Sequence, residues 1–202
     1  MSSSPRQEQV LVLFASQSGN SKRAALEIAD QLPNKLSTPN LTVTSRHMLL
    51  DDFLEQAEWT RLVVIVTSSY GAGQAPLGGH RFRELCNALV KQPREGMLKG
   101  ISFALLGLGD SKYMTYLRNP TQVDEALQLT GATRVGIFGK ANASGDQRAV
   151  ISQWIDGIWP SLEAVVKTPS PSKERLADIQ SDTVRLRREL GPDFMPEAKS
   201  NS

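Results

Sequence analysis

The sequence predicts an α/β fold in which helices cover both faces of a doubly wound, five-stranded parallel sheet. Five short apolar runs alternate with stretches whose apolar residues recur at helical spacing. The strongest runs contain no alternating polar residues, which is typical of parallel strands that crossover helices bury on both faces. This regular alternation favours one wound sheet over separate helical and β regions.

The predicted elements follow one another in strict order. Strands are expected at Val10 to Ala15, Leu41 to Ser45, Leu62 to Thr67, Ile101 to Leu108 and Arg134 to Phe138. Helices are expected at Asn20 to Leu32, Asp51 to Glu58, Arg81 to Val90, Thr121 to Leu129 and Gln147 to Leu162. Pro33 is expected to end the first helix, because proline has no N–H to donate.

Size, charge and cysteine content narrow the class of protein. A chain of 202 residues with 40% hydrophobic residues corresponds to about one soluble domain. Its 23 basic and 21 acidic residues leave a net charge of +2, which gives no argument for a nucleic-acid partner. The single cysteine, Cys86, lies among apolar residues of a predicted helix, and we interpret it as a buried thiol.

The C-terminal part has a different composition. Thr168 to Ser172 is rich in proline and serine, so we expect the folded domain at residues 8–167 and a linker and tail at 168–202. Glu174 to Leu190 is compatible with a charged helix. A solvated or frayed helix is favoured there over one that docks on a partner.

Other classes of protein find little support in the sequence. The N-terminus lacks an apolar signal core, and no run approaches the roughly 20 residues of a membrane span, so a cytoplasmic protein without membrane contact is expected. The two histidines, His47 and His80, lie in no nucleophile or metal-ligand pattern. Histidine-based hydrolysis is therefore disfavoured, and no metal site is expected.

Polar and glycine-rich segments follow three of the predicted strands, where ligands collect in wound α/β sheets. The first, Ser16 to Ser21, directly precedes a predicted helix and carries hydroxyls and Gly19. Such groups at a helix N-terminus suit a phosphate, although the same residues also suit a simple turn and helix cap. There is no Gly-x-x-x-x-Gly-Lys-Ser/Thr, and Gly107-Leu108-Gly109 lacks a third glycine, so a mononucleotide is favoured.

The other two segments each carry a tyrosine. Thr67 to Gly73 contains Tyr70, and Leu108 to Tyr113 ends on Tyr113. A flat aromatic ring can lie between two such side chains while nearby backbone groups bond to its rim. Together with the phosphate segment, these residues predict bound FMN.

The same segments resemble the FMN-binding, flavodoxin-like domain of the diflavin reductases, the group that contains cytochrome P450 reductase and methionine synthase reductase. The resemblance covers roughly Val10 to Leu162 and includes Trp159-Pro160 in the last helix. It implies that Ser16 to Ser21 hold the phosphate, that Tyr70 and Tyr113 cover the two flavin faces, and that Gly71 presents its peptide to flavin N5. The residues expected to bind FMN are Ser16, Gln17, Ser18, Gly19, Asn20, Ser21, Ser68, Ser69, Tyr70, Gly71, Gly73, Leu108, Gly109, Asp110, Tyr113 and Asn142.

Three features depart from the family pattern. Ala72 to Arg81 contains no acidic residue where relatives usually carry several, and Lys140 to Ala143 replaces a stretch that often carries an aspartate. Met114 to Arg118 also differs from relatives. The net charge of +2 contrasts with strongly acidic relatives, so docking through an acidic surface is not expected.

The resemblance implies a one-electron relay, in which FMN rather than a protein side chain carries the reaction. About 40 residues follow Leu162, too few for FAD and NADPH modules. Either a separate reductase is the donor and a redox protein the acceptor, or the sequence is an excised domain of a longer protein. Whether the chain is a carrier or a subunit of an NADPH-dependent oxidoreductase is open. The alternative is a flavodoxin-like interaction module with weak or no FMN binding. A quinone reductase is disfavoured, because Tyr70 would cover the open flavin face that it needs.

Overall fold

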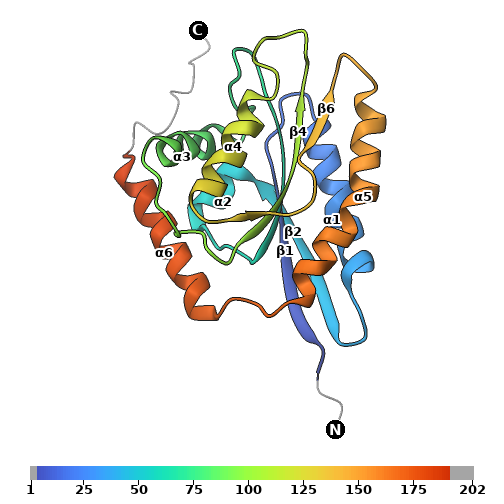
Figure 1. Cartoon of the computed structure of the whole chain (residues 1–202), viewed down its shortest axis with the longest axis vertical. Coiled ribbons are helices and arrows are strands. Elements are labelled where there is room, and N and C mark those ends of the chain that lie inside the picture. Colours follow the sequence, from blue (N-terminus) through green and yellow to red (C-terminus); the bar gives the residue numbers. More distant parts are fainter. Residues whose placement is uncertain (1–3, 192–202) are drawn as a thin grey trace.

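A parallel β-sheet forms the centre of the protein, and helices lie on both of its faces (Figure 1). The computed structural model describes residues 4–191. The sheet order is β2-β1-β3-β4-β5. The short strand β6 also pairs with β4, nearer its end than β5 does, so β5 and β6 together occupy the fifth position. The predicted five-stranded wound architecture is confirmed. The strands are β1 (Arg6–Phe14), β2 (Leu41–Leu49), β3 (Leu62–Ser68), β4 (Ser102–Gly109), β5 (Thr133–Arg134) and β6 (Gly139–Asn142).

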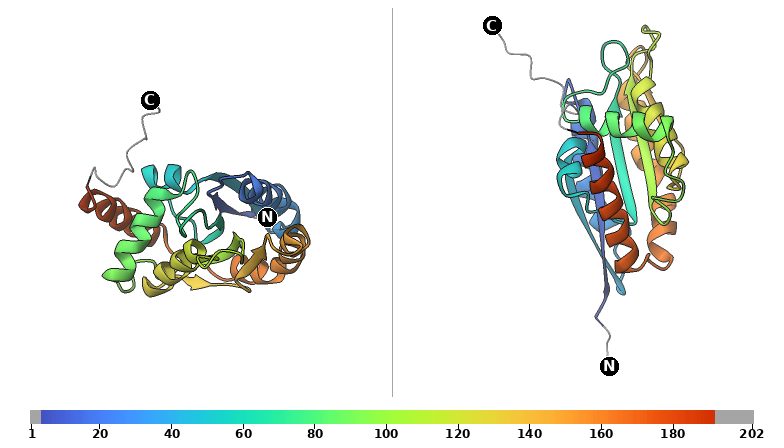
Figure 2. Two further views of the ribbon diagram at one scale, coloured as in Figure 1. Left: turned by 90° about the horizontal axis from the view of Figure 1, so that it is seen from above. Right: turned by 90° about the vertical axis from the view of Figure 1, so that its left-hand side faces the viewer.

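Alternate residues of the central strands β1, β3 and β4 are buried in two separate cores, one on each face of the sheet. In β1, Val10 and Val12 point into one core, whereas Leu11 and Leu13 point into the other, and all four are buried. Figure 2 shows helices on both faces of the sheet. The helices are α1 (Asn20–Leu36) and α5 (Gln147–Lys167) on one face, and α2 (Leu50–Gln56), α3 (His80–Lys91), α4 (Arg118–Leu129) and α6 (Lys173–Glu189) on the other.

The predicted fifth strand, Arg134 to Phe138, is wrong in most of its length. Only Thr133–Arg134 pairs with the start of β4, and the chain rejoins β4 as β6 after four intervening residues. Between them Gly136 adopts a left-handed conformation with φ 70°, which turns the chain out of the sheet. Ile137 is consequently 81% exposed, so an apolar residue there does not mark a buried strand.

Pro33 does not end α1, contrary to the expectation from sequence. The helix continues to Leu36, which is buried in the core. A proline inside a helix leaves the carbonyl four residues earlier without its usual donor. Here the Ser45 hydroxyl of β2 donates to that carbonyl, Ala29 O, at 2.6 Å, so the missing backbone bond is replaced from the neighbouring strand.

The segment after the proline-rich link is a folded helix that packs on its own protein. Ile179 and Thr183 of α6 are fully buried, and Trp59 Nε1 donates to Thr183 Oγ1 at 2.9 Å. Arg187 Nη1 donates to the carbonyl of Leu54, at the end of α2, at 2.6 Å. The expectation of a solvated or frayed helix is therefore wrong. The polar residues from 192 onward lie outside the described residues.

Two further expectations can be compared with the structure. Cys86 is fully buried, as interpreted from the sequence, and burial raises the pKa of its thiol to about 12. Within residues 4–191, no helix combines the length and the apolar character needed to cross a membrane.

We predict that Ile179→Ala lowers the free energy of unfolding by about 2–5 kcal/mol, because it leaves a cavity in a closed core. Urea unfolding followed by circular dichroism measures this change. The matched control is Asp178→Ala, an exposed neighbour on α6, which is expected to change the value by no more than about 0.5 kcal/mol. Equal effects of the two variants would show that α6 does not contribute to the core.

Candidate cofactor site

A cavity of about 430 Å³ opens at the carboxyl edge of the sheet, beside the point where the strand order reverses. Residues after β1, β3 and β4 meet there with the first residues of α1 and α5. It brings together most of the residues predicted for the site. Those that line it are Gln17, Ser18, Asn20, Ser21, Ser68, Ser69, Tyr70, Gly71, Leu108, Gly109, Asp110 and Tyr113.

The turn before α1 leaves backbone donors facing this cavity. Gly19 precedes the helix in a left-handed conformation with φ 92°, and its N–H donates to Ser16 Oγ at 2.9 Å. No side chain caps the helix, so the first amide groups of α1 remain available beside the hydroxyl of Ser21. Ser16 and Gly19 do not line the cavity themselves; they shape the turn that does. The arrangement is suited to an anion.

Tyr70 and Tyr113 lie on the two loops that border the cavity, and they are 50% and 63% exposed. The sequence analysis missed a third tyrosine, Tyr116, which also lines it. Burial raises the pKa of Tyr116, whose ring packs against Gly109 so closely that a Cβ there would lie 3.0 Å from Tyr116 Cδ2. Tyr116 lies three residues after the predicted segment that ends on Tyr113. This short distance in the sequence was the one available indication that it belongs to the site.

Gln147, the first residue of α5, was also missed, together with Thr115 and Ala143. Its side-chain Oε1 accepts a hydrogen bond from Asn20 Nδ2 at 3.3 Å, and its Nε2 donates to the Ala141 carbonyl at 3.1 Å. Gln147 therefore joins the start of α1 to β6. The helix cap before it is recognisable in the sequence, because Asp146 is a favoured N-cap residue. In the structure the Asp146 carboxylate accepts a hydrogen bond from the Ala149 N–H.

A buried hydrogen-bond junction fixes the loop after β3. Asn119 Nδ2 donates to Thr67 Oγ1 at 3.1 Å and to the Ser68 carbonyl at 3.0 Å. Arg83 Nη1 donates to Asn119 Oδ1 and to the Gly73 carbonyl, both at 3.0 Å. Gly73 thus does not line the cavity, but its carbonyl ties the loop to α3 and α4.

Asn142 also lies behind the cavity wall. Its Oδ1 accepts from the Ser111 and Ser144 N–H groups at 3.0 Å, and its Nδ2 donates to Ser111 Oγ at 2.8 Å. The Asp110 carboxylate accepts from Ser144 Oγ and from the Lys112 N–H, which lowers the pKa of Asp110. These bonds hold the loops after β4 and β6 together. Among the described residues that line the cavity, Asp110 carries the only charged side chain.

Comparisons with known proteins agree with this geometry. A family model described as Flavodoxin matches residues 12–154. The bifunctional cytochrome P450/NADPH–P450 reductase of Bacillus cereus is 35% identical over 152 residues, which cover 74% of this chain and 13% of that protein. Methionine synthase reductase of Mus musculus is 30% identical over 172 residues, 85% of this chain and 24% of that protein. The chain therefore spans only a small part of these relatives.

A solved structure supports the fold. The model resembles that of a mutant flavodoxin from Pseudomonas aeruginosa with a TM-score of 0.58 and 22% identity, over 77% of this chain and 99% of that chain. A short-chain flavodoxin associated with a bacterial microcompartment gives a TM-score of 0.52 at 21% identity, over 75% of this chain and 96% of that chain.

We predict that Asn119→Ala loosens the loop after β3, because it leaves buried partners at Thr67 and Arg83 unsatisfied. The expected cost is about 1–3 kcal/mol in the free energy of unfolding, with faster amide hydrogen exchange at Tyr70 to Gln74. Asn34→Ala, at an exposed position of α1, is the matched control and should leave both values unchanged. Unaltered exchange at Tyr70 to Gln74 in Asn119→Ala would contradict the anchoring role.

Proposed function

The chain belongs to the flavodoxin family, and from that premise we propose that it binds FMN in the cavity at the carboxyl edge of its sheet and relays single electrons. Flavodoxin-like domains bind FMN, and this cavity has a volume within the range of small-molecule sites. The observation that carries the proposal is the convergence of two tyrosines and an uncapped helix N-terminus on one cavity.

Each part of the cavity has a distinct task in this proposal. The amide groups at the start of α1 and the hydroxyls of Ser18 and Ser21 would hold the phosphate. Tyr70 and Tyr113 would hold the flavin ring, with the peptide of Gly71 available to its edge. Gly71 has a φ of 53°, and its carbonyl accepts a hydrogen bond from Thr115 Oγ1 at 3.2 Å. FMN supplies the one-electron chemistry when it is bound.

The proposed electron path needs two partners. The two relatives described above, which are 35% and 30% identical to this chain, are named as reductases of cytochrome P450 and of methionine synthase. These names support a role between a flavin reductase and a redox acceptor. We propose that a reductase with FAD and NADPH supplies the electrons. The proposal places this relay in the cytosol, a location with which the single, buried cysteine of the sequence, Cys86, is compatible.

One feature supports the alternative of an interaction module without redox work. The stretch Ala72 to Arg81, directly after the loop that carries Tyr70, contains no carboxylate that a cationic redox partner would recognise. Binding of FMN and its reduction separate the two functions experimentally.

We predict that the protein is yellow as purified and that its apo form binds FMN at micromolar concentration or below. Tyr70→Ala and Tyr113→Ala should each weaken binding about tenfold, because aromatic stacking is worth about 1–3 kcal/mol. Quenching of FMN fluorescence measures the affinity. Leu129→Ala, which removes an exposed apolar side chain far from the cavity, should bind like the unaltered protein. A colourless protein that ignores added FMN would support the interaction module instead.

We further predict that a stepwise titration of the FMN-loaded protein with dithionite proceeds in two resolved one-electron stages, followed by visible absorbance. Two stages are required of a relay that accepts and donates single electrons. Gly71→Ala should merge the stages, because φ 53° is costly for alanine and the substitution would shift the peptide that is proposed to face the flavin edge. Reduction of the unaltered protein in a single two-electron stage would contradict the relay.

A further inference from the structure

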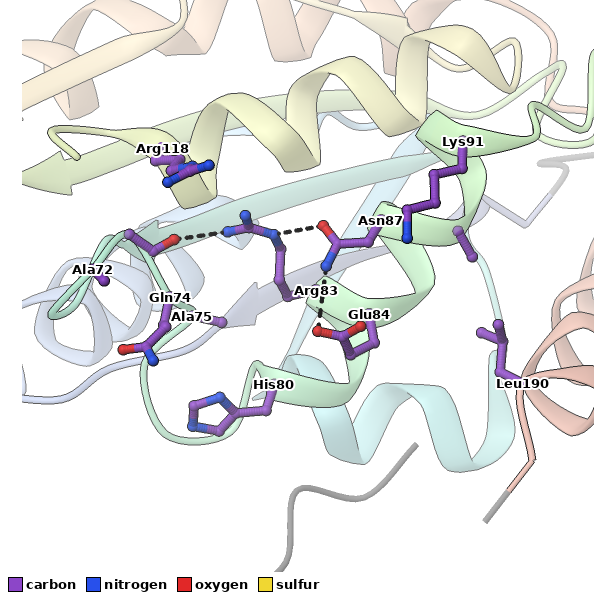
Figure 3. A pocket seen from close by; sticks show the side chains of 12 residues that line it. Ala72, Gln74, Ala75, His80, Arg83, Glu84, Asn87, Lys91, Arg118 and Leu190 are labelled. Atoms are coloured by element: carbon purple, nitrogen blue, oxygen red, sulfur yellow. Dashed lines mark hydrogen bonds between the residues drawn. The ribbon is translucent and has the colours of Figure 1, made fainter. Parts of the chain in front are cut away.

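A second cavity, of about 760 Å³, adjoins the same loop that borders the cofactor site. Residues 68–71 line the cofactor site, whereas residues 72–75 line this second cavity together with α3, Arg118 and Leu190 (Figure 3). Its lining includes three cationic side chains, Arg83, Lys91 and Arg118, and one carboxylate, Glu84. Positive charge therefore dominates a concave site of ligand size.

Arg83 is held rigidly at the wall of this cavity. Its Nε donates to Asn87 Oδ1 at 2.9 Å, and its Nη1 donates to the Gly73 carbonyl and to Asn119 Oδ1, both at 3.0 Å. A guanidinium has five N–H groups, so the two on Nη2 remain without a protein partner among the described residues. A guanidinium that is already fixed and has one free amino group is well suited to bind an anion, because little further side-chain entropy is lost on binding.

The positive charges around Arg83 are only partly compensated. Arg118 and Lys91 flank it in Figure 3, and neither has a side-chain hydrogen bond or ion pair to the part of the chain that the structure describes. Glu84, the one carboxylate of the lining, accepts from Asn87 Nδ2 at 3.2 Å and offsets part of this positive charge. Burial lowers the pKa of Arg83, and so does the charge of Arg118, whereas Cys86 and Glu84 raise it. With three cations and one carboxylate in the lining, a bound anion would balance the positive charge that remains.

We propose that this second cavity binds a small anion with at least two negative charges, held by Arg83, Arg118 and Lys91. The chemistry fits a phosphate ester or pyrophosphate and a di- or tricarboxylate alike, since guanidinium groups bind both in the bidentate manner. The described lining contains one aromatic ring, the imidazole of His80, and three cationic side chains, so its main feature is charge.

The bound anion would act on the loop that borders the cofactor site. Arg83 holds the Gly73 carbonyl, and the Gly73 N–H donates to the Tyr70 carbonyl at 3.0 Å, so a short chain of bonds connects the two cavities. Because coupling between two ligands is reciprocal, an anion that alters FMN affinity must have its own affinity altered by FMN to the same extent. This consequence rests on the proposed function, whereas binding of the anion does not.

Isothermal titration calorimetry of the full chain without FMN tests the proposal, with inorganic pyrophosphate and citrate as separate probes. We expect at least one probe to bind with a stoichiometry of one, and the stronger of the two to identify the phosphate or carboxylate class. Arg118→Gln and Lys91→Gln should each weaken that binding about tenfold, the cost of one charge-assisted hydrogen bond. The control is Lys173→Gln, which removes an equal charge at an exposed position outside the cavity.

The outcomes are decisive in both directions. No heat of binding from either probe, or equal weakening by Lys173→Gln, would overturn the site, because the second result is that of a diffuse surface charge. Addition of FMN to the same titration gives the coupling separately. A protein that binds the anion but not FMN would contradict the proposed function and leave the anion site intact.

Discussion

The parallel register of β1, β3 and β4 is the constraint on which both cavities depend. Phe14 pairs with Val66, and Ser68 pairs with Leu108, so the three strands end at nearly the same level. Loops that leave such strands have to meet at one edge of the sheet, however far apart they lie in the sequence. The cores on both faces fix this level, because shifting one strand by a residue would exchange the side chains that pack in the two cores.

Hydrogen bonds of Asn119 and Arg83 fix the conformation of the loop after β3 at this edge of the sheet. Parallel strands position the ends of the loops but not their tips, which are free to take several conformations. Asn119 ties the loop after β3 to the strand itself, and Arg83 ties its tip, at Gly73, to α3. Because buried polar groups are costly when unpaired, the two residues favour one loop conformation over its alternatives. Arg83 also lines the second cavity, and the loop that it holds borders the cofactor site.

The sequence predicted the sheet and most of the lining of the cofactor site because both follow from local patterns. Apolar runs reveal buried strands, and polar residues after them lie at the edge by geometry alone. Residues whose position depends on tertiary contacts were missed. Tyr116 reaches the cavity by packing on Gly109, and Gln147 does so from the start of a different helix. The nearness of Tyr116 to the segment that ends on Tyr113 and the cap residue Asp146 before Gln147 are visible in the sequence, but neither shows that the side chain reaches the cavity.

The errors in the predicted elements have the same origin. A proline ends a helix in the absence of another donor, and the donor at Ala29 comes from Ser45, on a different strand. The charged composition of α6 suggested a solvated helix, yet one buried face is enough to dock it when Trp59 offers a donor to Thr183. Docking in turn brings Leu190, at the end of α6, into the wall of the second cavity. The C-terminal helix thus completes a site that the sheet and its loops leave open on that side.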